Sequence, residues 1–391
     1  MQLATLEGVP RGVRLEDVTR SLNHWIEVDL DALAANARCL ASTMVPARLM
    51  GVVKANAYGH GASEVASALM GAGVEMFAVA WLSEAKALRE AGITATILAM
   101  EHCFPADATQ IVALDVAVTC HSRELAVALS MAAVASGRIA RIHVKVDTGL
   151  HRFGLDLSEA ISLAEYARSL PGVLVQGLWT HMANADEADD GFSDIQSGQF
   201  DVAVAALPWI PLVHAANSAS GLRRAGLRFD AVRAGVSLYG VIPDNTPDPG
   251  LTPVLSLKAR IARVTELRPG EGVSYGLTWR APSHAKVALV PVGYADGWRR
   301  SLGNVGFVLI SGVRCPIAGR VCMDQFIANV TGVQAVEEGD EVVLIGSQGG
   351  MRITAAEVAA LTDTIPWETL AGLGTRIPRI YHRSGVVVGP S

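Results

Sequence analysis

The sequence predicts a (β/α)₈ barrel followed by a smaller, mostly antiparallel β-domain. From about residue 25 to residue 240, short β-branched runs alternate with Ala/Leu/Glu-rich segments of helical periodicity. These runs lack a polar face, as expected for strands of a parallel sheet that is covered on both sides. About eight such units occur and no GxGxxG follows the first strand, so a closed barrel is favoured over a doubly wound sheet.

The individual elements can be placed in chain order. We expect barrel strands at 76–80, 95–100, 116–119, 141–146, 173–179, 212–214 and 231–236, with helices at 83–91 and 123–135. After residues 247–250, Gly/Pro/Asp turns separate short strands at 254–263, 285–291, 305–310 and 341–345, and one helix is expected near 355–361. The barrel is therefore predicted over residues 24–250 and the β-domain over 251–391, on which residues 1–23 could pack.

Composition limits the classes of function. The chain has 391 residues, of which 50% are hydrophobic and 18% charged, and a net charge of −6. This charge argues against nucleic acid or an anionic membrane as the main partner. Five cysteines without CxxC or metal-ligand spacing fit free thiols in a reducing cytoplasm, and no metal site is expected. With no apolar signal segment and no membrane-length run, we expect a soluble, cytoplasmic protein.

The segment VVKANAYGHG, residues 52–61, carries the clearest chemical signal. A hydrophobic strand delivers Lys54 into a short polar loop. Burying an ammonium is costly unless it is paired or used chemically. One such use is an imine with an aldehyde cofactor, because a lysine of lowered pKa is a competent nucleophile. The alternative is a lysine that reaches past the strand end to solvent.

Other polar residues follow further predicted strands, where barrel active sites lie. These residues are Lys145, Asp147, His181, Asn217, Ser218 and Arg233. Each has an ordinary structural explanation by itself; Arg233, for example, could pair with Asp230. Because they follow several different strands that open at one mouth, their joint pattern predicts a functional site.

The chain resembles the alanine racemase family. The matching motifs, in order, are VVKANAYGHG, KVDTGLHRFG, THMANADE, HAANSAS, VRAGVSLYG, GVSYGLTW, PVGYADG, GRVCMDQ and RIPRIY, which extend from about residue 25 to 381. The resemblance implies a barrel plus β-domain, pyridoxal 5′-phosphate as cofactor, an amino-acid substrate, and a homodimer whose subunits share their active sites. It implies interconversion of L- and D-alanine through a cofactor imine, supplying D-alanine for peptidoglycan.

The resemblance also implies residue roles. Lys54 would hold the cofactor and act as the base on the D face, Tyr275 would be the base on the L face, and His181 would activate that tyrosine. Arg233 would face the pyridine nitrogen. The remaining residues implied to bind the cofactor are Tyr58, Arg152, Asn217, Ser218, Gly235, Val236 and Thr375; those near the substrate are Arg152, Met323 and Tyr294. Lys145 is a candidate for carbamylation, with pairing to Asp147 or another acid as the alternative.

Two positions depart from the family pattern. Leu150 stands where methionine is common, a volume-conserving change. Thr375 stands where many members carry tyrosine, so we expect a wider entrance and better acceptance of serine or longer amino acids. A serine or broad-specificity racemase therefore remains open. A same-fold decarboxylase, a sugar-phosphate aldolase barrel and a non-catalytic carrier of pyridoxal phosphate fit the motif series less well.

Overall fold

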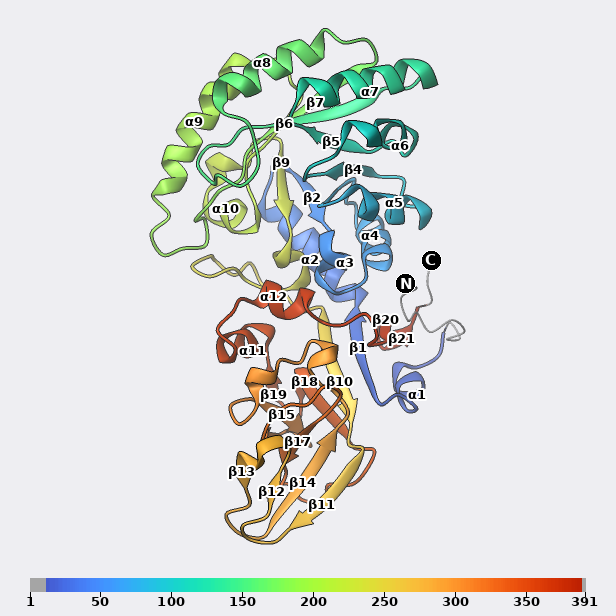
Figure 1. Cartoon of the computed structure of the whole chain (residues 1–391), viewed down its shortest axis with the longest axis vertical. Helices are drawn as coiled ribbons and strands as arrows, with labels where there is room; N and C mark the ends of the chain where they lie inside the picture. The colour runs from blue at the N-terminus through green and yellow to red at the C-terminus, as the bar shows by residue number, and fades with distance from the viewer. Residues whose placement is uncertain (1–11, 389–391) are drawn as a thin grey trace. The chain divides into compact units, whose positions relative to one another are not determined.

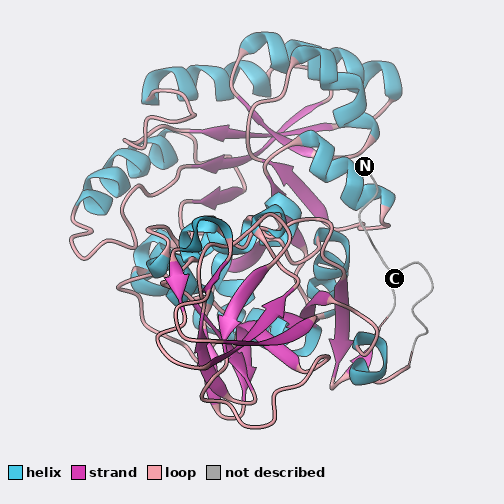
Figure 2. Cartoon of the chain, turned by 60° about the horizontal axis from the view of Figure 1, so that its bottom comes forward, coloured by secondary structure: helices cyan, strands magenta, loops and turns pink. Residues whose placement is uncertain are grey.

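The computed structural model describes residues 12–388, which form two compact units. We call them the barrel unit (residues 33–57 and 62–252) and the β-unit (residues 12–32, 58–61 and 253–388). Figure 1 labels the elements of both units, and Figure 2 shows the strands of the barrel unit with helices on their outer side.

The barrel unit confirms the predicted fold class. Its eight parallel strands are arranged in the order β8-β7-β6-β5-β4-β3-β2-β9. They are β2 (Arg48–Val52), β3 (Met76–Val79), β4 (Thr96–Ala99), β5 (Ala117–Cys120), β6 (Ala140–Lys145), β7 (Val173–Trp179), β8 (Leu212–His214) and β9 (Ala231–Ala234). Strands such as β3 and β5 are buried along their whole length, which explains their continuous apolar sequence.

The two end strands of this sheet, β8 and β9, are joined by backbone hydrogen bonds outside the regular ladders. Asp230 N donates to Val213 O at 3.0 Å and Arg233 N donates to Ala216 O at 3.0 Å. These bonds bring the ends of the sheet together into a nearly closed barrel. All the strand ends that carry the predicted polar residues therefore surround one mouth.

Helices cover the barrel between successive strands. They are α2 (Leu30–Thr43), α4 (Ala62–Gly71), α5 (Leu82–Glu90), α6 (Ala108–Ala113), α7 (Arg123–Ser136), α8 (Leu157–Arg168), α9 (Phe192–Ala206) and α10 (Ser218–Arg223). The short segment α3 (Lys54–Tyr58) is instead a left-handed turn after β2. Local sequence sets several of their ends. At α7, Ser122 caps the first turn by accepting from Leu125 N, and Gly137 ends the helix in the left-handed conformation.

The β-unit is built from three sheets (Figure 1). Its strands are β1 (His24–Asp29), β10 (Leu255–Arg260), β11 (Arg263–Leu267), β12 (Gly272–Val273), β13 (Trp279–Arg280), β14 (Ala285–Val290), β15 (Phe307–Ile310), β16 (Val313–Pro316), β17 (Phe326–Asn329), β18 (Glu341–Gln348), β19 (Met351–Ile353), β20 (Arg379–Arg383) and β21 (Val386–Val387). Its helices are α1 (Leu15–Thr19), α11 (Ala355–Leu361) and α12 (Pro366–Ala371). Most strand pairs are antiparallel, as predicted, and only β1 and β20 pair in parallel.

At the start of the region in which the alternating pattern was found, β1 pairs with β10 and β20 of the β-unit. Two details of the β-unit differ from the sequence prediction. The single strand expected over 254–263 is two strands, β10 and β11, which belong to different sheets. A second helix, α12, follows the predicted α11. The partner strands of β1 and β10 lie far away in the sequence, so local periodicity carries no signal for these pairings.

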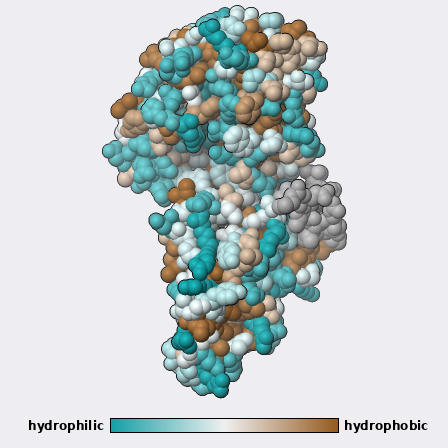
Figure 3. Space-filling model, viewed as in Figure 1, coloured by the Kyte–Doolittle hydropathy of each residue, from teal (hydrophilic) through white to brown (hydrophobic). Residues whose placement is uncertain are grey.

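The N-terminal segment packs within the β-unit. Leu15, Val18 and Leu22 pack against a cluster formed by Trp25, Ile380 and Val387. The prediction for residues 1–11 lies outside the described residues. Within residues 12–388, no helix is both long and apolar enough to cross a membrane. On the face shown in Figure 3, hydrophobic and hydrophilic side chains are interspersed.

Asn36 joins α2 to the end of the barrel unit, and its loss should destabilise the protein. The side chain is 2% exposed, donates to Leu238 O and Thr252 O, and accepts from Thr252 N. Asn36→Ala leaves the buried Leu238 O without this partner and removes two bonds to the backbone of the exposed Thr252, so we expect a loss of about 2 kcal/mol in the free energy of unfolding, measured with urea. Ser42→Ala, at an exposed position of the same helix, should change stability little. Equal losses in both variants would contradict this role.

Candidate functional site

Lys54 lies at the start of an unusual left-handed turn. After β2, the four residues 55–58 all have positive φ values between 52° and 54°. Such a run of non-glycine residues is strained and must be held by its surroundings. Here Glu84 accepts from Ala55 N at 2.6 Å, and Asn56 accepts from Ala62 N at 2.9 Å. The turn fixes Lys54 at the end of the strand.

The surroundings of Lys54 favour its neutral amine. Burial lowers the pKa of Lys54, Glu101 and Glu84 oppose this shift, and the charges of Arg152 and Arg233 add to it. A lysine with a lowered pKa has a larger unprotonated fraction at neutral pH, which is the form that attacks a carbonyl or removes a proton.

Lys145 at the end of β6 is more deeply buried. It is 2% exposed, and its Nζ has no hydrogen-bond partner but lies 4.5 Å from the centre of the Trp179 ring. Burial, followed by the charge of Arg152, lowers the pKa of Lys145 to about 8. Asp147, the expected partner of an unmodified Lys145, instead accepts hydrogen bonds from Gly149 N and His151 N.

Arg233 on β9 is the most fully engaged side chain of the mouth. It is 2% exposed and donates to three carbonyl oxygens, those of Thr180, His214 and Ala215, at 2.8–3.0 Å. Two histidine nitrogens also accept from it: Nδ1 of His214 at 2.8 Å and Nδ1 of His181 at 3.1 Å. Burial lowers the pKa of Arg233 to about 9, which leaves the guanidinium charged at neutral pH. Asp230 instead accepts from Val213 N.

His181 follows β7 and contacts this guanidinium directly. Burial of its ring holds the pKa of His181 well below the ordinary value, and the charges of Arg233, Lys145, Arg152 and Lys54 lower it further. The imidazole is therefore neutral at pH 7. Since an arginine can only donate, Nδ1 of His181 accepts and its ring proton is on Nε2.

Arg152 is the exposed member of the cation group. Its side chain is 54% exposed and lies 3.9 Å from a carboxylate oxygen of Glu101. An exposed pair at this distance is weak. Arg152 can therefore exchange Glu101 for another anion at little cost.

Four of the residues expected to bind the cofactor, Asn217, Ser218, Gly235 and Val236, follow the ends of β8 and β9. Ser218 accepts a hydrogen bond from Gly235 N at 2.9 Å, which directly connects two of the predicted residues. Asn217 caps α10, because its Oδ1 accepts from both the backbone and the hydroxyl group of Ser220. Val236 is buried at the start of the following 3₁₀ turn.

The other predicted residues lie in the β-unit. Tyr58 ends the left-handed turn. Tyr275, Tyr294 and Met323 are exposed by 74%, 43% and 54%. The loops that carry the last two are joined, since Tyr294 N donates to Cys322 O and Ala295 N donates to Met323 O. Thr375 is exposed beside Arg376.

Sequence reasoning missed several residues that build this geometry. Glu84 and Glu101 balance the cations, Trp179 stacks within the mouth, and His143 and His214 extend the contacts of Arg233 into the barrel. The histidines could have been found: a His in the middle of the apolar run RIHVKV is a rare choice for a barrel strand. The roles of Glu84 and Glu101 have no local signal.

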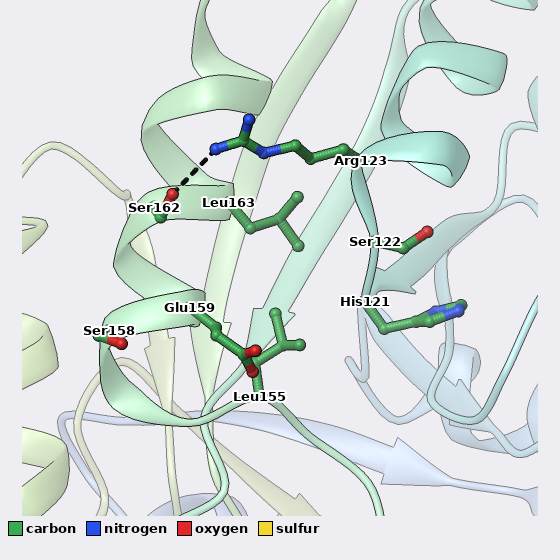
Figure 4. A pocket seen from close by; sticks show the side chains of 8 residues that line it. All are labelled: His121, Ser122, Arg123, Leu155, Ser158, Glu159, Ser162 and Leu163. Atoms are coloured by element: carbon green, nitrogen blue, oxygen red, sulfur yellow. Dashed lines mark hydrogen bonds between the residues drawn. The ribbon is translucent and has the colours of Figure 1, made fainter.

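A separate cavity of about 410 Å³ lies between the starts of α7 and α8, with Arg123, Ser158 and Ser162 among its lining residues (Figure 4). None of the predicted site residues lines it. Among residues 12–388, no group of three His, Cys, Asp or Glu side chains is placed to hold a metal ion. The strand-end mouth is therefore the candidate site.

Fold and site together define a barrel-plus-β-unit protein with a cation-rich mouth around a lysine of lowered pKa. Comparison with known proteins identifies the group. Residues 28–243 match the model "Alanine racemase, N-terminal domain", and residues 254–381 match "Alanine racemase, C-terminal domain". The chain belongs to the alanine racemase family.

Individual relatives agree with this assignment. An alanine racemase of Symbiobacterium thermophilum is 41% identical over 367 residues, covering 91% of this chain and 96% of the relative. One of Mycobacterium bovis is 40% identical over 366 residues, covering 91% and 95%. The crystal structure of alanine racemase from Bacillus anthracis with bound L-Ala-P is 37% identical, with a TM-score of 0.87 over 94% of this chain and 97% of that one.

The buried Lys145 should make the cofactor-free protein less stable at neutral than at alkaline pH. Its pKa is 10.5 unfolded and about 8 folded, so between these values the unfolded chain binds more protons and stability rises with pH. Below pH 8 the buried ammonium costs about 3 kcal/mol. Lys145→Met should therefore melt higher than wild type at pH 7, and the gap should close towards pH 10.

This comparison needs carbonate-free buffer, because carbamylation would also remove the charge. Lys86→Met, which alters an exposed lysine, should show no such pH-dependent gap. A difference between Lys145→Met and wild type that stays constant from pH 7 to pH 10 would contradict the buried charge.

Arg376 should control the loops that present Tyr294 and Met323. It donates to the fully buried Asp296 at 2.6 Å and to Asp324 at 2.7 Å, linking the turn after Gly293 to the loop after Cys322. Arg376→Gln should cost about 1–2 kcal/mol of stability, since a buried carboxylate loses its partner while the arginine itself is half exposed. In a racemase assay this variant should also raise KM by a larger factor than it lowers kcat.

The matched control is Arg383→Gln, which removes an exposed ion pair with Asp31 in the same unit. It should leave KM, kcat and stability nearly unchanged. If the two variants behave alike, Arg376 has no special role in holding these loops.

Proposed function

We propose that this protein interconverts L- and D-alanine with pyridoxal 5′-phosphate as cofactor. The observation that carries the proposal is the mouth itself, where a lysine of lowered pKa lies among Lys145, Arg152 and Arg233. Two acids, Glu101 and Glu84, face this cation group. Its excess of positive charge suits an anionic ligand.

The residues present fit the cofactor. Lys54 supplies an amine for its aldehyde, and the Ser218 hydroxyl with the backbone around Gly235 and Val236 supplies small polar groups for its phosphate. The buried Nζ of Lys145 has no hydrogen-bond partner, and once carbamylated this side chain would itself be an anion that holds Arg152 beside the cofactor. When bound, the cofactor supplies a conjugated ring that stabilises the negative charge left at an α-carbon that has lost its proton.

The protein's own groups then move and hold protons. Lys54 Nζ takes or returns the α-proton on the D face, because its lowered pKa keeps part of it unprotonated. Tyr275 Oη does so on the L face and is contributed by the partner subunit of a homodimer. The neutral His181, with its proton on Nε2, would hydrogen-bond with that hydroxyl group. Arg233, which stays charged, would face the pyridine nitrogen of the cofactor and would keep that nitrogen unprotonated.

The biological setting belongs to the same proposal. The five cysteines at positions 39, 103, 120, 315 and 322 are free, which fits a reducing cytoplasm. There the product D-alanine would be used for peptidoglycan. Met323 and Tyr294 would contact or admit the substrate. Thr375 would leave a wider entrance than tyrosine, so L-serine is the competing substrate to test.

The proposal predicts distinct losses for the two bases. In deuterated water, wild type should convert L-alanine to D-alanine with deuterium at the α-carbon, faster than it converts L-serine or L-lysine. Lys54→Ala should abolish both racemisation and exchange. Tyr275→Phe should lower racemisation about 10²- to 10⁴-fold, while exchange starting from D-alanine persists through Lys54. Chiral chromatography with mass spectrometry measures both reactions.

Tyr166→Phe, which changes a tyrosine on α8, is the control and should behave as wild type. Faster inversion of serine or lysine would change the substrate but keep the chemistry. No inversion or exchange with any of the three amino acids would favour a non-catalytic carrier of pyridoxal phosphate.

A further inference from the structure

A chain of hydrogen-bonded side chains extends from Arg233 into the middle of the barrel. Nδ1 of His214 on β8 accepts from Arg233 at 2.8 Å, and Nε2 of His214 lies 2.9 Å from Nδ1 of His143 on β6. Both histidines are buried, with exposures of 0% and 1%. Barrel interiors are normally filled by apolar side chains, and burying polar ones is costly. Two histidines here therefore require an explanation.

The strand next to His143 is shaped to accept its ring. A Cβ atom placed on Gly177 of β7 would lie only 2.2 Å from His143 Nδ1, so no larger residue fits while the ring is there. The register between β6 and β7 also shifts at this point, between Ile142 and His143, which leaves Gln176 as the extra residue of a bulge. On the other side, the Trp179 ring stacks on His214 at 5.7 Å with an angle of 13°.

The direction of every hydrogen bond in the chain follows from Arg233. Because a guanidinium can only donate, Nδ1 of His214 must accept, and a neutral His214 then carries its proton on Nε2. That proton is donated to His143 Nδ1, so His143 in turn carries its proton on Nε2. The opposite arrangement would set an N–H of His214 against an N–H of Arg233.

Both rings are neutral at pH 7. Burial lowers the pKa of His143 to about 4; the Gln176 side chain opposes this shift and the Arg233 charge adds to it. Burial, then the charges of Arg233 and His143, hold the pKa of His214 well below its ordinary value. A neutral ring of fixed tautomer can act as acceptor on one side and donor on the other, as His214 does, and the chain ends at Nε2 of His143, which has no hydrogen-bond partner.

We propose that His143 and His214 are positioning residues, which hold Arg233 so that His181 keeps Nδ1 unprotonated and presents its proton on Nε2. His214 occupies one donor of Arg233, and His143 provides the acceptor that His214 needs in order to stay in that tautomer. The remaining donors are thereby directed at His181 and the carbonyl oxygens of Thr180 and Ala215. The inference rests on the proposed function only in the catalytic use of His181 and Arg233.

The first test is the tautomer of each ring in the cofactor-free wild-type protein. Histidine labelled with ¹⁵N reports by NMR which ring nitrogen carries the proton. We expect His143, His181 and His214 to be protonated on Nε2 alone between pH 6 and pH 8. A proton on Nδ1 of His143 or His214 would overturn the proposal, whatever the enzyme's activity. Because this readout needs neither cofactor nor substrate, it is independent of the proposed function.

The second test removes the end of the chain. His143→Leu keeps bulk but provides no acceptor, so we expect His181 to populate both tautomers or to titrate at higher pH. In the holoenzyme, kcat should fall about ten- to a hundredfold with KM changed little, because Arg233 is displaced. His143→Gln, whose amide oxygen can accept from His214, should restore the wild-type His181 signal and much of kcat.

The controls separate positioning from loss of structure. Gly177→Ala displaces the His143 ring without altering it and should reproduce the His143→Leu spectrum. His121→Gln, at a histidine after the neighbouring strand β5, should leave His181 unchanged. If His143→Leu does not fold, the comparison of Gly177→Ala with His143→Gln gives the same information. A wild-type His181 tautomer and titration in Gly177→Ala or His143→Leu would overturn the proposal.

Discussion

The buried guanidinium of Arg233 is the interaction on which the rest of the barrel mouth depends. It donates hydrogen bonds to carbonyl oxygens at the ends of β7 and β8 and to two histidine rings. The backbone N–H of Arg233 makes one of the bonds that join β8 to β9. These strands are where the barrel closes. This one residue therefore helps to hold the barrel closed and also determines which nitrogen of each neighbouring histidine is unprotonated.

The second constraint is an imbalance of charge. Four cations, Lys54, Lys145, Arg152 and Arg233, lie at the mouth; burial lowers the pKa values of both lysines, and repulsion from the two arginines adds to this shift. A protein without a ligand gains nothing from such an arrangement. Binding of an anion, as in the proposed function, would offset this repulsion.

The strained backbone at residues 55–58 also acts on Lys54. Four consecutive positive φ values are unfavourable locally, and the hydrogen bonds made by Glu84 and Asn56 hold the turn in place. Lys54 is thereby positioned by the backbone of this turn and surrounded by the charged side chains of the mouth. Rigid support of this kind is what positions a reactive amine against a bound group.

The sequence by itself determined the barrel, the β-domain and the set of strand ends that carry chemistry. Hydrophobic periodicity and strand-end placement are local properties, and they suffice to identify Lys54, Lys145, His181 and Arg233 as candidates. Only the tertiary structure decided that β1 pairs with β10 and β20, that Arg376 bridges two loops, and that His143 and His214 direct Arg233. Those features join groups far apart in the chain, and whether a donor meets an acceptor depends on folded distances that no local pattern encodes.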